Sequence, residues 1–291
     1  MKRAWPIVGL FLLGAGFVLA QRQFGFGGYQ GWGRSYDDVK TAREIPTGST
    51  GTPLWNNPVG FEKEAFTFTR IRYTSARGYG RRGRGGWDTD LPDSDLNLSY
   101  RLQQMTSIKV DPDGRIVNIL DPDLHEFPWT YMAEPGAMLL SDLEVPALRK
   151  YLLNGGFLML DDFWGEAAWE TVEREFQRVF PEYRFVELPL DHPLYNCVFS
   201  IKAKGQVPNI RTGAESEYTG ITWENHDGDS RTVHHRAIFD DKGRLLVLAT
   251  HNTDNGDGWE REGESAYYFA NFSEKIAYPL GINIIFYVMT H

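Results

Sequence analysis

Two adjacent carboxylates, Asp161 and Asp162, are the best candidates for chemistry in this sequence. They follow a short apolar run at 157–160, which is typical of a strand covered on both faces. Their oxygens could bind a divalent cation, or one carboxylate could act as a general base if its neighbours raise its pKa. Successive side chains of a strand point to opposite sides, so we expect one to face a site and the other a helix N-terminus. The structural alternative is a helix cap and an arginine partner.

A Gly-rich loop at 77–90 is the second candidate, because it carries Arg81, Arg82 and Arg84, with Trp87 and Asp88 after these arginines. Guanidinium groups donate in a bidentate fork, so the loop suits phosphate, carboxylate or an anionic sugar. It lacks the Gly-Lys-Ser/Thr ending of a phosphate-binding P-loop. The alternative is a solvated loop held by its own aspartates.

A polar run at 251–259 is the third candidate, with His251, Asn252, Asp254 and Trp259 as ligand-binding residues. Oxygen-bearing side chains alternating with glycine can wrap calcium, but the twelfth-position glutamate of an EF-hand is missing. An Asx-rich turn is the alternative. If the preceding strand runs parallel to 157–160, this run should lie close to Asp161.

Other common catalytic arrangements are not indicated. The pairs at 191–192 and 234–235 contain histidine, but no zinc-binding spacing such as HExxH or CxxC occurs. No G-x-S-x-G motif of a serine hydrolase is present. The sequence therefore predicts no cofactor, although a divalent cation is possible at the acidic pair or at the 251–259 run.

The element that must position the acidic pair is a helix–turn–strand–helix unit. Ser141 and Glu144 form a capping box, and apolar residues recur at helical spacing as far as Leu152. Gly155 and Gly156 end that helix, and a second helix begins after the strand, near 166. This unit is half of a doubly wound α/β sheet, in which ligands sit at the carboxyl ends of the strands.

The N-terminus predicts export. Basic residues Lys2 and Arg3 precede an apolar stretch ending in a small-residue cleavage site at Ala20, so residues 1–20 read as a signal peptide. An uncleaved membrane anchor is the alternative. Residues 21–60 form a Gly/aromatic arm and linker, either a tether or an arm that docks on the domain or a partner. Residues 61–291 form one α/β domain.

Composition limits the partners of the exported chain. Loss of Lys2 and Arg3 leaves 28 basic against 39 acidic residues, a net charge of −11, so nucleic acid is excluded as a partner. Cys197 is the only cysteine, so no intrachain disulfide can form. We expect a periplasmic or secreted protein that contacts a membrane only through an uncleaved N-terminal segment.

The remaining elements follow from periodicity and turn residues. We expect strands at 66–73, 108–110, 127–132 and 184–188, a helix at 96–106, and an irregular segment from 191 to 213. Hairpin strands follow at 221–223 and within 237–249. A final apolar helix spans 266–289, and Pro279 should kink or break it.

From 66 to 291 the pattern resembles a bacterial family known as domain of unknown function 4159. The motifs that carry the resemblance are, in order, Phe68–Tyr73, Gly86-Trp87, Asp95–Asn97, Ser141–Glu144, Leu148–Leu152, Asn154–Phe157, Asp161-Asp162, His251-Asn252, Asp254, Trp259 and Leu280–Asn283. The resemblance implies a flavodoxin-like, mostly parallel doubly wound sheet similar to class I glutamine amidotransferases, with hairpins added near the C-terminus. It implies no particular activity.

One departure from the amidotransferase pattern decides the functional prediction. The turn that carries the catalytic cysteine in those enzymes here carries Asp161 and Asp162, and Cys197 lies elsewhere. We therefore expect a non-catalytic domain of the cell envelope that binds a small molecule or an envelope protein. One alternative is a carboxylate-dependent hydrolase, on glycans for example, using the acidic pair with His192 or Asp254. Another is a structural component of an envelope assembly, docked through the arm.

Overall fold

The computed structural model describes residues 36, 38–49, 51–60, 65–75, 86–224 and 228–291. The expected signal peptide and the Gly/aromatic tract at 23–33 lie outside the described residues. So do Arg81, Arg82 and Arg84 of the expected anion-binding loop.

The described residues form a mixed α/β domain around a seven-stranded sheet of order β2-β1-β3-β4-β7-β6-β5. The first five strands in this order are parallel, whereas β6 is antiparallel to both of its neighbours. The strands are β1 (Thr69–Arg72), β2 (Arg115–Asn118), β3 (Trp129–Ala133), β4 (Phe157–Phe163), β5 (Val186–Glu187), β6 (His234–Phe239) and β7 (Leu245–His251).

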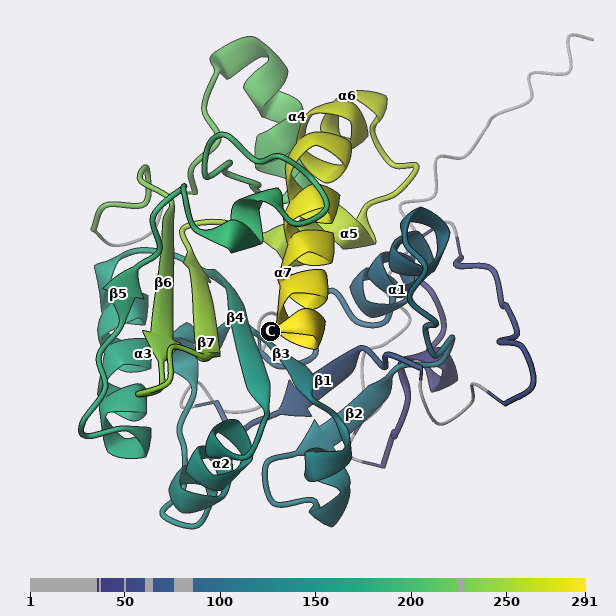
Figure 1. Ribbon diagram of the computed structural model, residues 1–291. Helices are drawn as coiled ribbons and strands as arrows, with labels where there is room; N and C mark the ends of the chain where they lie inside the picture. The colour runs from purple at the N-terminus through teal and green to yellow at the C-terminus, as the bar shows by residue number, and fades with distance from the viewer. Residues whose placement is uncertain (1–35, 37, 50, 61–64, 76–85, 225–227) are drawn as a thin grey trace, which may run out of the picture. The chain divides into compact units, whose positions relative to one another are not determined.

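Helices cover both faces of the sheet (Figure 1). On one face pack α2 (Glu144–Leu153) and α3 (Glu166–Val179). The other face is covered by α1 (Asp93–Met105), α4 (Ile210–Thr219), α5 (Asn255–Glu260), α6 (Ala266–Tyr268), a π-helix η5 (Phe269–Ala277) and α7 (Tyr278–Thr290). Short 3-10 helices are η1 (Ala42–Glu44), η2 (Pro122–Glu126), η3 (Pro135–Ala137) and η4 (Pro193–Asn196). None of the helices in the described ranges is long and apolar enough to span a bilayer.

The central unit forms as its sequence predicts. The Ser141 amide donates to Glu144 Oε2 (2.8 Å), and the Glu144 amide donates back to Ser141 Oγ (3.3 Å), which is the predicted capping box. A Cβ on Gly156 would overlap the Tyr151 ring, so only glycine fits that turn. All seven residues of β4 are buried, and β4 lies inside the sheet between β3 and β7.

Several elements differ from the sequence-based expectation. The second strand lies at 115–118, beyond the turn at 111–114, and Val110 makes only a single bridge to Phe66. Residues 221–223 form no strand; they lie beside α4, a helix that the sequence analysis did not predict. The chain continues past Pro279 because Pro279 occupies the first turn of α7, directly after the π-helix.

Part of the expected linker packs on the domain. Ala42 is fully buried, and the amides of Gly48 and Ser49 donate to Asp93 Oδ2 at 2.7 and 3.2 Å. Trp55 Nε1 donates to the Val110 carbonyl (2.9 Å). Composition alone pointed to a free chain here because these contacts use small polar residues and backbone groups rather than an apolar stripe.

Candidate functional site

Four residues other than glycine have positive φ in the described part of the chain, and all lie at the carboxyl edge of the parallel strands. They are Asp90 (63°), Glu134 (47°), Asp162 (58°) and Asn252 (62°). Glu134 and Asn252 directly follow β3 and β7, Asp162 is near the end of β4, and Asp90 lies between β1 and α1. Such conformations cost on the order of 1–3 kcal/mol each and gather at functional sites. The predicted edge is therefore also the strained one.

Asp161 is fully buried, and both of its carboxylate oxygens are occupied. Oδ1 accepts hydrogen bonds from Thr250 Oγ1 (2.5 Å) and Asn255 Nδ2 (2.7 Å). Oδ2 accepts from Tyr131 Oη (3.1 Å) and the Gly256 amide (3.0 Å). Burial raises the pKa of Asp161, and hydrogen bonds from these donors oppose the rise. Asp161 therefore meets a helix N-terminus, as predicted, but it is that of α5, which it holds in position.

Asp162 is placed differently from its neighbour. The pairing of β4 with β7 shifts register between Leu160 and Phe163, and the positive φ of Asp162 lies within this irregularity. Its Oδ1 accepts a hydrogen bond from Trp164 Nε1 (3.2 Å). Burial, followed by the nearby carboxylates of Glu134 and Glu224, raises the pKa of Asp162 well above its usual value. Of the pair, Asp162 is the better suited to take up or release a proton.

Three further carboxylates meet beside α5. One oxygen from each of Asp90, Asp254 and Asp257 lies within 4.8 Å of the others, and the three residues are only 8%, 4% and 4% exposed. Asp254 Oδ1 caps α5 by accepting from the Asp257 amide (2.7 Å). Asp257 Oδ2 accepts from the Ile210 amide (2.6 Å), and its Oδ1 accepts from Arg261 Nε (3.2 Å). These bonds fix two carboxylates so that both face Asp90.

Asp90 is the unsatisfied member of this group. Its buried Oδ2 has no hydrogen-bond partner among the described residues. A Cβ on Gly256 would lie within 3.0 Å of this oxygen, closer than real Cβ atoms come, so glycine is required for the approach of α5. A buried acceptor without a partner costs about 1–3 kcal/mol. The folded chain therefore keeps this unfavourable free energy at the edge of the sheet where the positive-φ residues lie.

Carboxylates outnumber cations in this group, since Arg261 pairs with Asp257 (3.2 Å) but forms no ion pair with Asp90 or Asp254 among the described residues. Burial raises the pKa of Asp90 well above its usual value, and Asp257 and Glu260 raise it further; Arg70 opposes them. Burial also raises the pKa of Asp254, followed by the charges of Asp162 and Asp257. Carboxylates this close must either hold protons or share a cation. Two oxygens on opposite sides of a bound Ca²⁺ are about 5 Å apart, so the spacing suits such an ion.

His251 and Asn252 lie at this edge, as predicted, but both are occupied by structural contacts. His251 Nε2 lies 3.1 Å from the Gly165 carbonyl, and Nδ1 lies 3.1 Å from an Arg236 nitrogen. Asn252 Oδ1 accepts from the Gly165 amide (2.8 Å). Its Nδ2 donates to the carbonyls of Asp229 (3.1 Å) and Thr232 (2.8 Å). The two residues join β7 to the turn before α3 and to the 229–232 segment.

The predicted aromatic ligands are core residues. Trp259 is fully buried and packs against Tyr131 at 5.7 Å between ring centroids. Trp87 is buried beneath the Arg72 guanidinium, 4.8 Å from the ring centroid. Both carry an indole Nε1 without a partner among the described residues. Asp88 is exposed next to Trp87, and the structure does not bring it to the carboxylate group.

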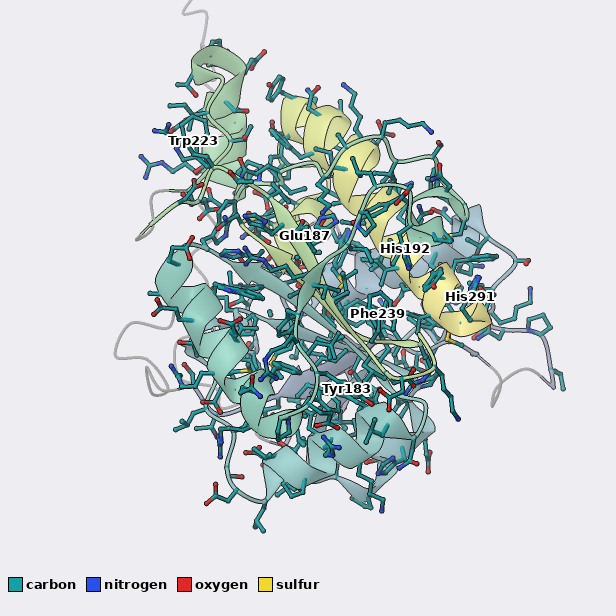
Figure 2. All side chains as sticks on the ribbon, turned by 60° about the vertical axis from the view of Figure 1, so that its left-hand side comes forward. Tyr183, Glu187, His192, Trp223, Phe239 and His291 are labelled. Carbon is teal, nitrogen blue, oxygen red and sulfur yellow. The ribbon has the colours of Figure 1, made fainter. Side chains whose placement is uncertain are left out.

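Cys197 and His192 lie on the α7 face of the sheet. Cys197 Sγ contacts the carbonyls of Leu194 (3.4 Å) and Asn283 (3.3 Å), and burial raises the pKa of this thiol. His192 packs against Tyr287 of α7, with ring centroids 5.1 Å apart. Figure 2 shows His192 beside the helix that ends at His291. Of the partners expected for a hydrolase, the structure brings Asp254 close to Asp162 but places His192 beside α7.

The sequence analysis did not select Asp90, Asp257, Glu134 or Glu224. Asp257 was visible within the 251–259 run, and Asp90 ends the Gly-rich loop, where it was read only as a partner for arginine. Their grouping depends on how the segments after β1 and β7 meet. No spacing along the chain encodes that meeting.

The family model described as domain of unknown function (DUF4159) matches residues 67–289, which is most of the chain. A search of curated proteins finds no match. The chain belongs to the DUF4159 family.

Proposed function

We propose that this member of the DUF4159 family is a ligand-binding domain that holds a divalent cation through Asp90, Asp254 and Asp257. The observation that carries the proposal is the buried, unpartnered Oδ2 of Asp90, which faces two carboxylates whose oxygens lie within 4.8 Å. Oxygen ligands of this kind suit Ca²⁺ or Mg²⁺ rather than a thiophilic metal. Water or a ligand oxygen would complete the coordination.

The test is titration of the purified, chelator-treated chain with Ca²⁺, Mg²⁺ and Mn²⁺, followed by calorimetry and thermal unfolding. At 100 times the dissociation constant, a cation adds about 2.7 kcal/mol of stability, which raises Tm by about 5–10 °C in a chain of this size. Asp90→Asn and Asp254→Asn should remove the shift. Asp142→Asn, at a fully exposed carboxylate, is the matched control and should keep it. Millimolar cations without effect, or an Asp90→Asn protein that binds as well as the wild type, would refute the site.

A carboxylate-dependent hydrolase is the second candidate function, and the placement of Asp162 favours it. This residue combines positive φ, burial and a raised pKa at the carboxyl end of β4, where class I amidotransferases carry their nucleophile. A screen of nitrophenyl glycosides and esters with added Mn²⁺ or Mg²⁺ tests it. Turnover should disappear in Asp162→Asn; activity that survives the substitution removes this candidate.

We also propose that the fold is flavodoxin-like and that the chain works outside the cytoplasm. The order β2-β1-β3-β4 supports the first point, with β7 in the position of a fifth parallel strand and β6 and β5 as the added hairpin edge. The basic residues and apolar run before Ala20 support the second. Its partner would then be a small molecule or an envelope protein. Mass spectrometry of the exported protein should find Gln21 as its first residue.

A further inference from the structure

A cavity of about 550 Å³ lies between α4 and the segment that follows it. Asn209, Thr212 and Glu215 line it from the N-cap and the body of α4, and Trp223, Glu224 and Arg231 line it from the other side. Figure 2 shows Trp223 beside α4. The volume falls within the range of small-molecule sites.

The cavity and the carboxylate group share one piece of backbone. The Ile210 amide donates to Asp257 Oδ2 (2.6 Å), and the adjacent Asn209 amide donates to Glu224 Oε1 (2.8 Å). The charge of Glu224 also raises the pKa of Asp162 and of Asp254. The cavity therefore neighbours the proposed cation site, but its lining residues are different.

The charges of the lining select the class of ligand. Arg211 pairs with Glu215 (3.1 Å), whereas Glu224 and the carboxylates behind Ile210 give the cavity a negative field, which repels an anion. An organic cation would compete with Arg231, which already lies over the Trp223 ring at 4.9 Å from its centroid. The carboxylates disfavour an anion and the Arg231 charge disfavours a cation, so the lining favours a neutral ligand.

The chemistry of the remaining groups suits hydroxyls. Carboxylates accept hydrogen bonds from hydroxyl groups, and amide, hydroxyl and guanidinium groups of Asn209, Thr212 and Arg231 donate to them. Arg231 lies over one face of the Trp223 ring, but Trp223 still lines the cavity and, with Ile221, offers apolar surface for the C–H face of a sugar ring. We propose that this cavity binds a neutral saccharide. The inference goes beyond the cation site and does not require it.

The experiment is ligand-observed saturation-transfer NMR with calorimetry on the full chain in EDTA, so that loss of the cation site cannot affect the result. The probes are maltose, cellobiose and N,N′-diacetylchitobiose, with glucuronate as the anion and tetramethylammonium as the cation. At least one neutral disaccharide should bind, and more tightly than both charged probes. No binding by the three disaccharides, or stronger binding of a charged probe, would overturn the proposal.

Two substitutions place the binding in the cavity. Trp223→Ala should weaken it at least about tenfold, because it removes the large apolar side chain against which the sugar ring would lie. Tyr218→Ala is the matched control, since Tyr218 lies on α4 but is 86% exposed and does not line the cavity. Thr212→Arg, which fills the cavity from the helix, should abolish binding if Trp223→Ala does not fold. Equal affinity in all three variants would refute the site.

Discussion

Two groups of charged residues on the same sheet are balanced in opposite ways. Around Glu187 of β5, Lys204, His234 Nδ1 (3.2 Å) and Arg236 Nε (3.7 Å) surround a single carboxylate. Burial alone would raise the pKa of Glu187, but hydrogen bonds from Lys204 and His234 lower it. The group at Asp90, Asp254 and Asp257 instead gathers carboxylates, whose pKa values rise where a shift is resolved. The first group is complete within the chain, whereas in the second Arg261 pairs with Asp257 and Asp90 Oδ2 has no hydrogen-bond partner among the described residues.

The largest expected effect is on stability, at Asp161, which holds α5 in place rather than facing the group of Asp90, Asp254 and Asp257. Asp161→Asn should lower the free energy of unfolding by about 3 kcal/mol, because an amide NH₂ would face donors that now share a carboxylate. Urea unfolding in EDTA measures this loss. Asp142→Asn should change stability by less than about 0.5 kcal/mol. A stable Asp161→Asn protein would mean that α5 is not held by this residue.

The stability contributed by His235 on β6 and that contributed by the buried carboxyls should depend on pH in opposite directions. Burial lowers the pKa of His235 on β6 to about 3, from a usual value of 6.5. As pH falls below about 6.5 the unfolded chain takes up this proton first, so stability is lost towards pH 3. Between pH 6.5 and 5 the wild type should lose about 2 kcal/mol more than His235→Gln. Lys204 and His234 lower the same pKa further, and Tyr195 Oη bonds Nδ1 at 2.8 Å.

For the buried carboxyls at the carboxyl edge of the sheet, the pH dependence of folding stability has the opposite sign. A carboxyl whose pKa is raised by folding contributes stability below its unfolded value and loses it as pH rises through the folded pKa. Asp90, Asp162 and Asp254 all fall in this class. Parallel unfolding curves for the wild type and His235→Gln from pH 6.5 to 5 would contradict the assignment for His235.

A double-mutant cycle of Gly256 and Asp90 tests the close approach of α5 to Asp90. Gly256→Ala should destabilise the chain by about 1–3 kcal/mol, since the new methyl group would meet Asp90 Oδ2 and Tyr131 Oη. Asp90→Ala should recover part of that loss in the double variant. A double-mutant cycle from urea unfolding measures the coupling, and strict additivity would show that the two residues do not meet as described.

The smallest expected stability changes, those of Asp90→Asn and Glu187→Gln, should have opposite signs and so distinguish the two groups of charged residues. In EDTA at neutral pH, Asp90→Asn should stabilise the chain by about 1 kcal/mol because it removes one member of a repelling, buried set. Glu187→Gln should instead destabilise it by up to about 1 kcal/mol, the usual range for a partly exposed ion pair. Chemical unfolding measures both changes. Destabilisation by both would mean that Asp90 is balanced by a partner.

The sequence predicted the centre of the fold better than its periphery. The capping box at Ser141, the glycine turn and the buried run at 157–160 are local signals, and the structure confirms each of them. The strand at 115–118 was missed because its pattern is short and follows a turn that looked like its end. The helices α4 and α5 were missed because they are rich in polar residues and glycine.

The sequence analysis placed Asp161, Asp162 and Asp254 at one edge of the sheet because parallel strands end together, and the structure has them at that edge. Their role as a functional site stays a prediction. The choice of Trp87 and Trp259 failed because a tryptophan next to polar residues reads the same whether it is buried or exposed. Asp90 reaches the group through a long connection after β1, and only the packing of α5 against it reveals the contact.

The N-terminal contacts with α1 give the chain a built-in mechanical link. Gly48 and Ser49 are bound to Asp93, and Asp93 is three residues from Asp90. If the chain is pulled from its N-terminus, the bonds of Tyr36 and Val39 to Arg72 of β1, and of Lys40 to Ile116 of β2, would carry the load before Gly48 and Ser49 pass it to α1. The first turn of α1, and with it the position of Asp90, would then respond only after those bonds break.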